Sequence, residues 1–271
     1  MRMTVITSHK NWKAFFSELW EYRDVFLFLG WRSIIIQYKQ TALGVAWVLI
    51  RPLLTVAIFT FIFSRIVGIE SQGTPYPLLV FSGMLVWQFF SDMLMFGSNC
   101  FINNQQLISK VYLPRLLLPA SRILCSLVDF SIAFVFYLIL SMVRYGIYPS
   151  LSFLTIPFLI IWLVIITFAV SLFFASIIVR YRDFVYVVPF AVQLGVYITP
   201  VGFDLAIAPL YIQYILACNP LTGVISGFRW ALLCQSIQPG ILVISSLATV
   251  FVIIISFSYF KRAEPLFSDV I

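Results

Sequence analysis

The chain has 271 residues, of which 62% are hydrophobic and only 10% are charged, and its mean hydropathy is +1.04. Soluble domains contain about 45–50% apolar and about 25% charged residues, so this composition excludes an ordinary soluble protein. The net charge of +7 indicates orientation in a membrane rather than nucleic-acid binding. Because helices satisfy their own backbone groups in lipid, the sequence predicts an all-α integral membrane protein.

Residues 11–29 form an amphipathic segment. At 100° per residue, its acidic residues, including Glu18 and Glu21, share one face, and most of its aromatic residues share the opposite face. This pattern is typical of a helix that lies in the membrane interface instead of crossing it. We therefore assign residues 1–40 to an N-terminal region that contains an interfacial helix and contacts membrane lipid.

Six hydrophobic blocks follow, each about long enough for a helix that crosses the roughly 30 Å hydrocarbon core. They are residues 41–66, 78–101, 117–143, 153–179, 184–203 and 240–260. With their connections they form a transmembrane domain at residues 41–262, and residues 263–271 form a tail. Most of the 17 Lys and Arg residues lie in the N-terminal region, in the second and fourth connections, and after the last block. The positive-inside rule then places both termini in the cytoplasm.

Residues 204–239 are apolar but are broken by proline and glycine. Two segments within them, 209–217 and 220–233, are each too short to cross the membrane. They predict a pair of short helices that dip back from the outer surface, because broken helices are tolerated where they line a cavity. The alternative is a seventh span with a proline kink, which would carry the basic C-terminus to the outer side.

The sequence contains no motif of a catalytic centre. It has no GxxxxGK[ST] phosphate-binding loop, no HExxH or GxSxG, and no His or carboxylate cluster at metal-ligand spacing. The four cysteines lack CxxC spacing, and their neighbours favour small buried apolar side chains, with a Cys218–Cys234 disulfide as the alternative. We expect no enzyme and no cofactor or metal bound by this chain. If ATP hydrolysis drives it, another chain binds the ATP.

Arg51 lies inside the first hydrophobic block, roughly 15 Å from its start. A charge at that depth costs at least about 2.5–3.5 kcal/mol on insertion scales. Asp92 and Asp129, in the second and third blocks, lie at a similar depth. The sequence therefore predicts an intramembrane ion pair, with Asp92 favoured because it continues a polar stripe. The alternatives are that Arg51 snorkels toward cytoplasmic water or faces a wet channel unpaired.

Five stretches occur in a characteristic order along the chain. These are YKQTALGVAWVLIRPLL, YPLLVFSGMLVWQFF, NNQQLISKVYLPRLLLP, RYRDF and NPLTG. Together they resemble the ABC-2 type permeases that export polysaccharides such as O-antigen, capsule and teichoic acid. The resemblance covers about residues 11–262. Each stretch alone is a weak signal, and their order and spacing on a six-span chain make the match specific.

The resemblance implies a homodimer that works with two copies of a separate cytoplasmic ATPase, on which ATP and Mg would bind. It implies export of a lipid-linked polysaccharide, most of all O-antigen, across the inner membrane, and short outer gate helices between spans five and six. Two alternatives remain. One is an ABC-2 exporter of drugs or lipids, and the other is an ATP-independent channel or secondary transporter in which Asp92 or Asp129 carries protons.

The resemblance also implies which residues contact the ATPase. A short cytoplasmic helix between spans two and three docks on the ATPase in such transporters, and the polar island at residues 103–115 occupies that place. The candidates are Gln105, Gln106 and Lys110 of the island, Glu18 and Glu21 of the interfacial helix, and Arg182 of RYRDF. The alternatives are a solvated loop, a simple membrane anchor, and a turn in which Arg182 pairs with Asp183.

Glycan channels often use aromatic rings, because the C–H faces of sugars stack on rings while the hydroxyls need polar partners. The fifth block carries such a stripe at helical spacing. The channel candidates are Tyr186, Phe190, Gln193 and Tyr197 of this stripe, with Phe59, Phe63 and Gln88 from the first two blocks. The alternative is that these rings only pack in the core or face lipid, because aromatic residues make up 18% of the chain.

Overall fold

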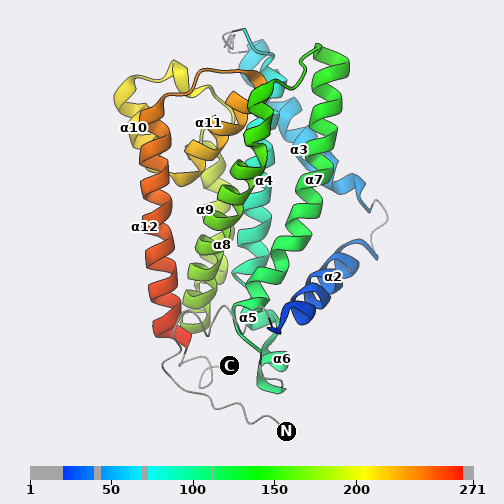
Figure 1. Ribbon diagram of the computed structural model, residues 1–271, viewed down its shortest axis with the longest axis vertical. Helices are drawn as coiled ribbons and strands as arrows, with labels where there is room; N and C mark the ends of the chain where they lie inside the picture. Colours follow the sequence, from blue (N-terminus) through cyan, green and yellow to red (C-terminus); the bar gives the residue numbers. More distant parts are fainter. Residues whose placement is uncertain (1–20, 40–43, 67, 69–72, 111–112, 265–271) are drawn as a thin grey trace.

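The computed structural model describes residues 21–39, 44–66, 68, 73–110 and 113–264, which form a bundle of helices (Figure 1). Five helical segments among them are long and apolar enough to cross a membrane. This confirms an all-α integral membrane protein. The helices are α2 (Arg23–Lys39), α3 (Ala46–Phe59), α4 (Tyr76–Gly97), α5 (Cys100–Asn103), α6 (Gln105–Lys110), α7 (Leu117–Tyr145), α8 (Ile156–Arg180), α9 (Phe184–Ile198), α10 (Leu210–Ala217), α11 (Pro220–Leu233) and α12 (Pro239–Ala263).

Three shorter elements complete the described chain. A π-helix, η1 (Thr60–Ile66), continues α3, and two 3₁₀ turns, η2 (Leu151–Thr155) and η3 (Leu205–Ile207), precede α8 and α10. The five candidate spans are Ala46–Phe63, Tyr76–Gly97, Leu117–Tyr145, Leu151–Arg180 and Pro239–Ala263.

The fifth predicted block, residues 184–203, forms a shorter helix than expected. Helix α9 has 15 residues and ends at Ile198. Thr199 precedes Pro200, and the clash with a following proline ring disfavours helical backbone, so Thr199 is extended with ψ of 141°. The assignment of α9 as a sixth span stays a prediction, because its helix alone is short for the hydrocarbon core.

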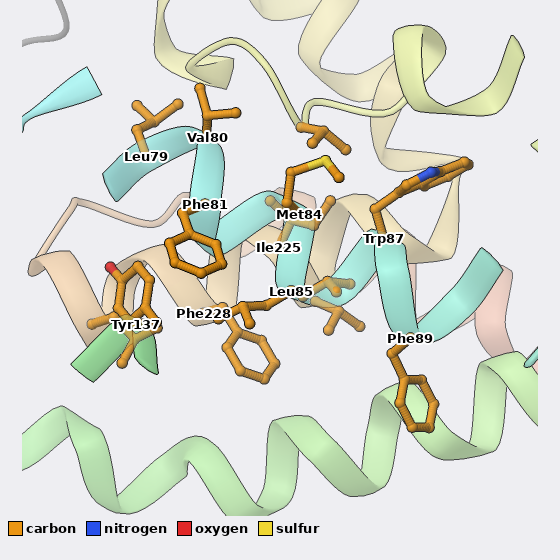
Figure 2. Close-up of a cluster of buried hydrophobic side chains, with 14 of the residues drawn as sticks. Leu79, Val80, Phe81, Met84, Leu85, Trp87, Phe89, Tyr137, Ile225 and Phe228 are labelled. Carbon is orange, nitrogen blue, oxygen red and sulfur yellow. The ribbon is translucent and has the colours of Figure 1, made fainter. Parts of the chain in front are cut away.

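Helix α4 lies at the centre of the bundle and supplies more of the core than any other helix. Its span is 78% buried, whereas that of α3 is only 11% buried. Figure 2 shows Phe81 and Leu85 of α4 among side chains from α7 and α11, including Tyr137 and Phe228. The rings of Phe81 and Tyr137 meet edge to face with centroids 5.5 Å apart. Lipid is as apolar as these side chains, so close packing rather than exclusion of water stabilises this core.

A second buried cluster marks one end of the bundle. It joins Phe101, beyond α4, to Leu116 before α7, Val179 near the end of α8 and Phe260 near the end of α12. Several basic residues gather at the same helix ends: Lys110, Arg115, Arg180, Arg182, Lys261 and Arg262. We call this the basic end, and the positive-inside rule predicts that it faces the cytoplasm.

Helix α2 packs along the half of α7 that begins at the basic end (Figure 1). The predicted interfacial helix at residues 11–29 lies largely outside the described residues, and the described part continues ten residues further, to Lys39. Leu29 and Gly30 are buried, and a side chain at Gly30 would collide with Leu124 of α7. Close contact with α7, which the periodicity of α2 alone does not reveal, therefore sets the position of this helix.

The broken segment folds into two short helices that match the predicted bounds within one residue. Asn219 joins α10 to α11. Its side chain accepts a hydrogen bond from the backbone N–H of Leu221 and donates one to Thr199 Oγ1 at 2.9 Å. A Cβ at Gly223 would lie 2.9 Å from Trp162, so only glycine allows α11 to approach α8 this closely. The NPLTG stretch is thus explained by capping and packing.

The cysteines are only partly as expected. Cys100 and Cys125 are buried, but Cys218 and Cys234 are exposed, so the prediction of four buried thiols is wrong for the second pair. Both exposed residues stand at helix C-termini, where the chain turns at the surface. All four thiols are free, and the alternative disulfide between Cys218 and Cys234 is absent from this structure.

Candidate functional site

The polar island folds into α5 and α6, which project from the basic end of the bundle (Figure 1). The side chains of Gln105, Gln106 and Lys110 are exposed on α6, whereas Leu107 and Ile108 pack against the cluster at that end. Helix α6 therefore has an apolar inner face that holds it on the bundle and a polar outer face that a partner can contact.

The other candidates for contact with an ATPase occupy separate places. Arg182 is exposed in the turn between α8 and α9, and no salt bridge links it to Asp183 within the described chain. Glu21 is exposed near the start of α2, and Glu18 lies outside the described residues. Arg182 thus shares the basic end with α6, which permits contact with one partner.

The aromatic stripe of α9 lies on the surface of the single chain. Tyr186, Phe190 and Tyr197 are 80%, 62% and 67% exposed, and Gln193 is exposed between them. The ring of Tyr197 stacks on that of Phe59 of α3, with centroids 6.5 Å apart. Exposed apolar surface of this extent marks contact with lipid, with a partner or with a ligand.

Residues of α3, η1 and α9 together form one surface, which we call the aromatic face: Phe59, Phe63, Tyr186, Phe190, Gln193 and Tyr197. Phe63 joins it through Phe59, whose ring centroid lies 5.5 Å away. Gln88, the remaining channel candidate, is half-buried in a different place. The structure therefore divides the predicted channel residues between this face and a separate cavity.

A cavity of about 200 Å³, which we call the polar cavity, lies where α2, α3, α4 and α7 meet. Each helix contributes polar side chains to its wall, which is unusual in so apolar a bundle. These are Gln37 and Tyr38 of α2, Trp47 and Arg51 of α3, Gln88 and Asp92 of α4, and Arg122 and Asp129 of α7. All three residues of the predicted ion pair thus line one cavity.

A chain of hydrogen bonds crosses from α7 to α2 and back along the wall of the polar cavity. Arg122 donates to Gln37 Oε1 at 2.7 Å, and Gln37 Nε2 donates to Asp129 Oδ2 at 2.8 Å. The hydroxyl of Tyr38 donates to the other oxygen of Asp129. The guanidinium of Arg122 also lies over the ring of Phe96, 4.0 Å from its centroid. The buried carboxylate of Asp129 is therefore compensated by two donors from α2.

Tyr38 remains a hydrogen-bond donor over the whole physiological pH range. Burial of its phenol, together with the neighbouring Asp129 carboxylate, raises the pKa of Tyr38 well above its usual value. The phenol therefore keeps its proton near neutral pH and can donate to Asp129 there.

Arg51 lies closer to the start of its helix than the sequence predicted. Helix α3 begins at Ala46, so Arg51 is in its second turn, and its side chain is exposed. Within the described residues, no salt bridge joins it to Asp92 or Asp129. Asp129 is bonded to α2, and Asp92 Oδ2 accepts from Gln88 at 2.9 Å. The three charges share a cavity, but their direct pairing stays a prediction.

Comparison with known proteins identifies the family. Residues 24–233, more than half of the chain, match the ABC-2 type transporter family. The chain belongs to this family. It is 25% identical over 249 residues to an O-antigen export system permease protein RfbA of Klebsiella pneumoniae, which is 92% of this chain and 95% of that protein. The resemblance to ABC-2 polysaccharide export permeases is thereby confirmed.

Two further relatives carry the same name. A second RfbA of Klebsiella pneumoniae is 30% identical over 213 residues, 76% of this chain and 79% of that protein. The RfbA of Myxococcus xanthus is 26% identical over 215 residues, 78% of this chain and 81% of that protein. The region that matches the ABC-2 family includes the polar cavity, α6 and the aromatic face.

This ABC-2 permease contains site residues that reasoning from the sequence missed. The sequence analysis assigned no site role to Gln37, Tyr38 or Arg122, yet they form the link between α2 and α7. One signal was available in the sequence. The polar pair Gln37–Tyr38 directly follows three isoleucines, and polar side chains that are buried in a helix need hydrogen-bond partners.

Arg229 of α11 is a further residue whose role in the permease was missed. It is 3% exposed, and its guanidinium donates to the backbone carbonyls of Val201 and Phe203, each at 2.9 Å, and to that of Leu79 at 3.4 Å. Arg229 thus ties α11 to the segment after α9 and to the first turn of α4. Its signal in the sequence was a lone arginine within the apolar run GFRWALL.

Proposed function

We propose that this chain is the membrane subunit of an ABC transporter that exports a lipid-linked polysaccharide, of the O-antigen class, across the inner membrane. The observation that carries the proposal is the match over 92% of the chain to a permease named for O-antigen export. The exposed aromatic face supports it, since stacked rings beside an amide suit the alternating C–H faces and hydroxyls of a glycan.

In this proposal, ATP and Mg bind to a separate cytoplasmic subunit, present in two copies. The sequence carries no phosphate-binding loop, so the energy must reach this chain through contacts. The polar outer face of α6 and the exposed Arg182 turn lie at the basic end, where such a subunit would dock. Arg115, between α6 and α7, donates to the backbone carbonyl of Glu264 beyond α12, so movement at α6 would also reach the end of α12.

Two copies of the permease would form the channel between them. The span of α3 is the least buried of the five, and Tyr186, Phe190 and Tyr197 of the aromatic face are exposed in the single chain. In a two-fold dimer the same surface meets its own copy, so two aromatic faces would line one path. A glycan would advance along these rings while its lipid anchor stays in the membrane.

Cysteine cross-linking tests the docking step. Gln106→Cys and Lys110→Cys, in a Cys218→Ser/Cys234→Ser background, should cross-link to cysteines on the ATP-binding subunit in the assembled complex. The control is Tyr148→Cys, an exposed position beyond the opposite end of α7, which should not cross-link. Failure at both α6 positions for every partner cysteine tested would contradict docking through α6. ATP hydrolysis by the purified permease alone would contradict the proposal that ATP binds to a separate subunit.

A further inference from the structure

The polar cavity contains hydrogen-bonding groups that the fold leaves unused. Within the part of the chain that the structure describes, the Arg51 side chain has no hydrogen-bond acceptor, and Asp92 Oδ1 and Gln88 Oε1 have no donor. All three residues line the cavity. A free cationic donor and two free acceptors in one concave site indicate a ligand that both donates and accepts hydrogen bonds.

The charges around the cavity favour a neutral ligand. Two arginines, Arg51 and Arg122, balance two carboxylates, Asp92 and Asp129, so the wall carries no formal net charge. Arg122 and Asp129 are already joined through Gln37. A phosphate group placed beside Arg51 would also meet Asp92, whose carboxylate would repel it. Hydroxyl groups suit this mixture better, because each can donate to a carboxylate and accept from a guanidinium.

The volume of the cavity and the aromatic part of its wall restrict the kind of ligand that can bind. The volume of about 200 Å³ is below the roughly 300–1,000 Å³ of pockets that hold drug-sized ligands, so one ring fits rather than a chain of rings. Trp47 lines the cavity and is 44% exposed, which leaves part of its indole available for stacking. A polyhydroxylated ring fits both parts of the wall, because its hydroxyls suit the polar side chains and its C–H face suits the indole.

We propose that the polar cavity binds one neutral sugar residue of the exported glycan. This inference rests on the proposed function and names a recognition site for that substrate. Asp92 and Gln88 would accept from sugar hydroxyls, and Arg51 would donate to them. The cavity lies toward the basic end, since Arg51 is near the start of α3 and Asp92 is near the end of α4. It would therefore select the glycan on the cytoplasmic side, before the glycan reaches the aromatic face.

Saturation-transfer NMR on the purified full-length permease in detergent tests this proposal. The probes are neutral methyl glycosides of glucose, galactose, mannose and rhamnose, with inorganic phosphate as the competitor. We expect transfer to at least one glycoside and no displacement by phosphate. Arg51→Gln and Asp92→Asn should each weaken binding roughly 10-fold or more, because each removes a charged hydrogen-bonding partner. The matched controls, Arg144→Gln and Asp183→Asn, change exposed residues outside the cavity and should leave binding unchanged.

A third variant guards against misfolding of the charge variants. Val48→Trp adds apolar volume to the cavity wall without removing a charge, and it should also abolish transfer. Absence of transfer to all four glycosides, equal transfer in the cavity variants, or displacement by phosphate would overturn the proposal. Export of surface polysaccharide is measured in the same strains. If the natural chain exports glycan but binds no glycoside, only the sugar site in the polar cavity is overturned. If it exports no glycan, the proposed function is overturned.

Discussion

At the scale of single residues, Asp129 shows how this bundle tolerates a carboxylate among apolar helices. Its side chain is 8% exposed, and it accepts hydrogen bonds from both Gln37 and Tyr38. An unpartnered buried carboxylate would be far more costly than a bonded one. The two donors come from α2, so the carboxylate makes the stability of α7 depend on the position of α2.

Removal of one donor should destabilise the protein measurably. Tyr38→Phe keeps the ring but leaves one Asp129 oxygen without its phenol donor. We expect the free energy of unfolding to fall by about 1–3 kcal/mol, as for other hydrogen bonds to buried charged groups. Chemical unfolding in detergent measures it. Tyr148→Phe, at an exposed tyrosine, is the control, and equal stability of the two variants would refute the role of the Tyr38 hydroxyl.

At the other end of the bundle, Arg229 holds separate segments together by donating hydrogen bonds to their backbone carbonyls. Arg229→Met keeps much of the side-chain volume but leaves the carbonyls of Val201 and Phe203 without their donor. We expect a loss of roughly 2–5 kcal/mol, and Arg229→Lys should restore only part of it, since lysine lacks the planar fork of donors. Arg144→Met is the control, because Arg144 is exposed. A stable Arg229→Met variant would show that water satisfies these carbonyls equally well.

At the scale of helices, the sequence predicted those elements whose ends are set by local chemistry. Pro220 and Asn219 start α11, and Pro209 precedes α10, so both short helices were predicted within one residue. Helix α2 was predicted poorly, because its length follows from packing on α7. The location of Arg51 was also misjudged, since the start of α3 at Ala46 is not marked by a capping side chain. Contacts between distant segments, such as Gln37 with Arg122, leave no local signal.

The packing of α2 on α7 can be tested at Gly30. Gly30→Val would force a side chain into the space of Leu124, whereas Arg32→Val introduces the same side chain on the exposed face of α2. We expect Gly30→Val to lower the free energy of unfolding by about 1–3 kcal/mol more than Arg32→Val, the usual cost of overpacking. Similar values for the two variants would mean that α2 does not hold this position in the protein.

At the scale of the whole molecule, the fold separates three surfaces that one export cycle would use in turn. The polar face of α6 lies at the basic end, the polar cavity lies between α2 and α7, and the aromatic face lies on α3 and α9. The central core around α4 contacts the aromatic face through Phe59 and Phe63 and the polar cavity through Val48, whereas α6 packs on the separate cluster at the basic end. The sequence pointed to the first and third surfaces, because helical spacing and local polarity are visible in one segment, but the cavity required four helices to meet.

Surface polysaccharide on cells that lack their own permease tests the central claim most directly. The natural chain, expressed with its ATP-binding subunit, should restore export. The triple variant Tyr186→Leu/Phe190→Leu/Tyr197→Leu keeps α9 apolar, so it should insert normally, but export should fall roughly 10-fold or more because the rings that stack on the glycan are lost. The matched control, Val243→Leu/Val250→Leu/Phe251→Leu, changes three exposed residues of α12 and should have little effect. Failure of the natural chain to restore surface polysaccharide, or full export by the α9 variant, would contradict this account.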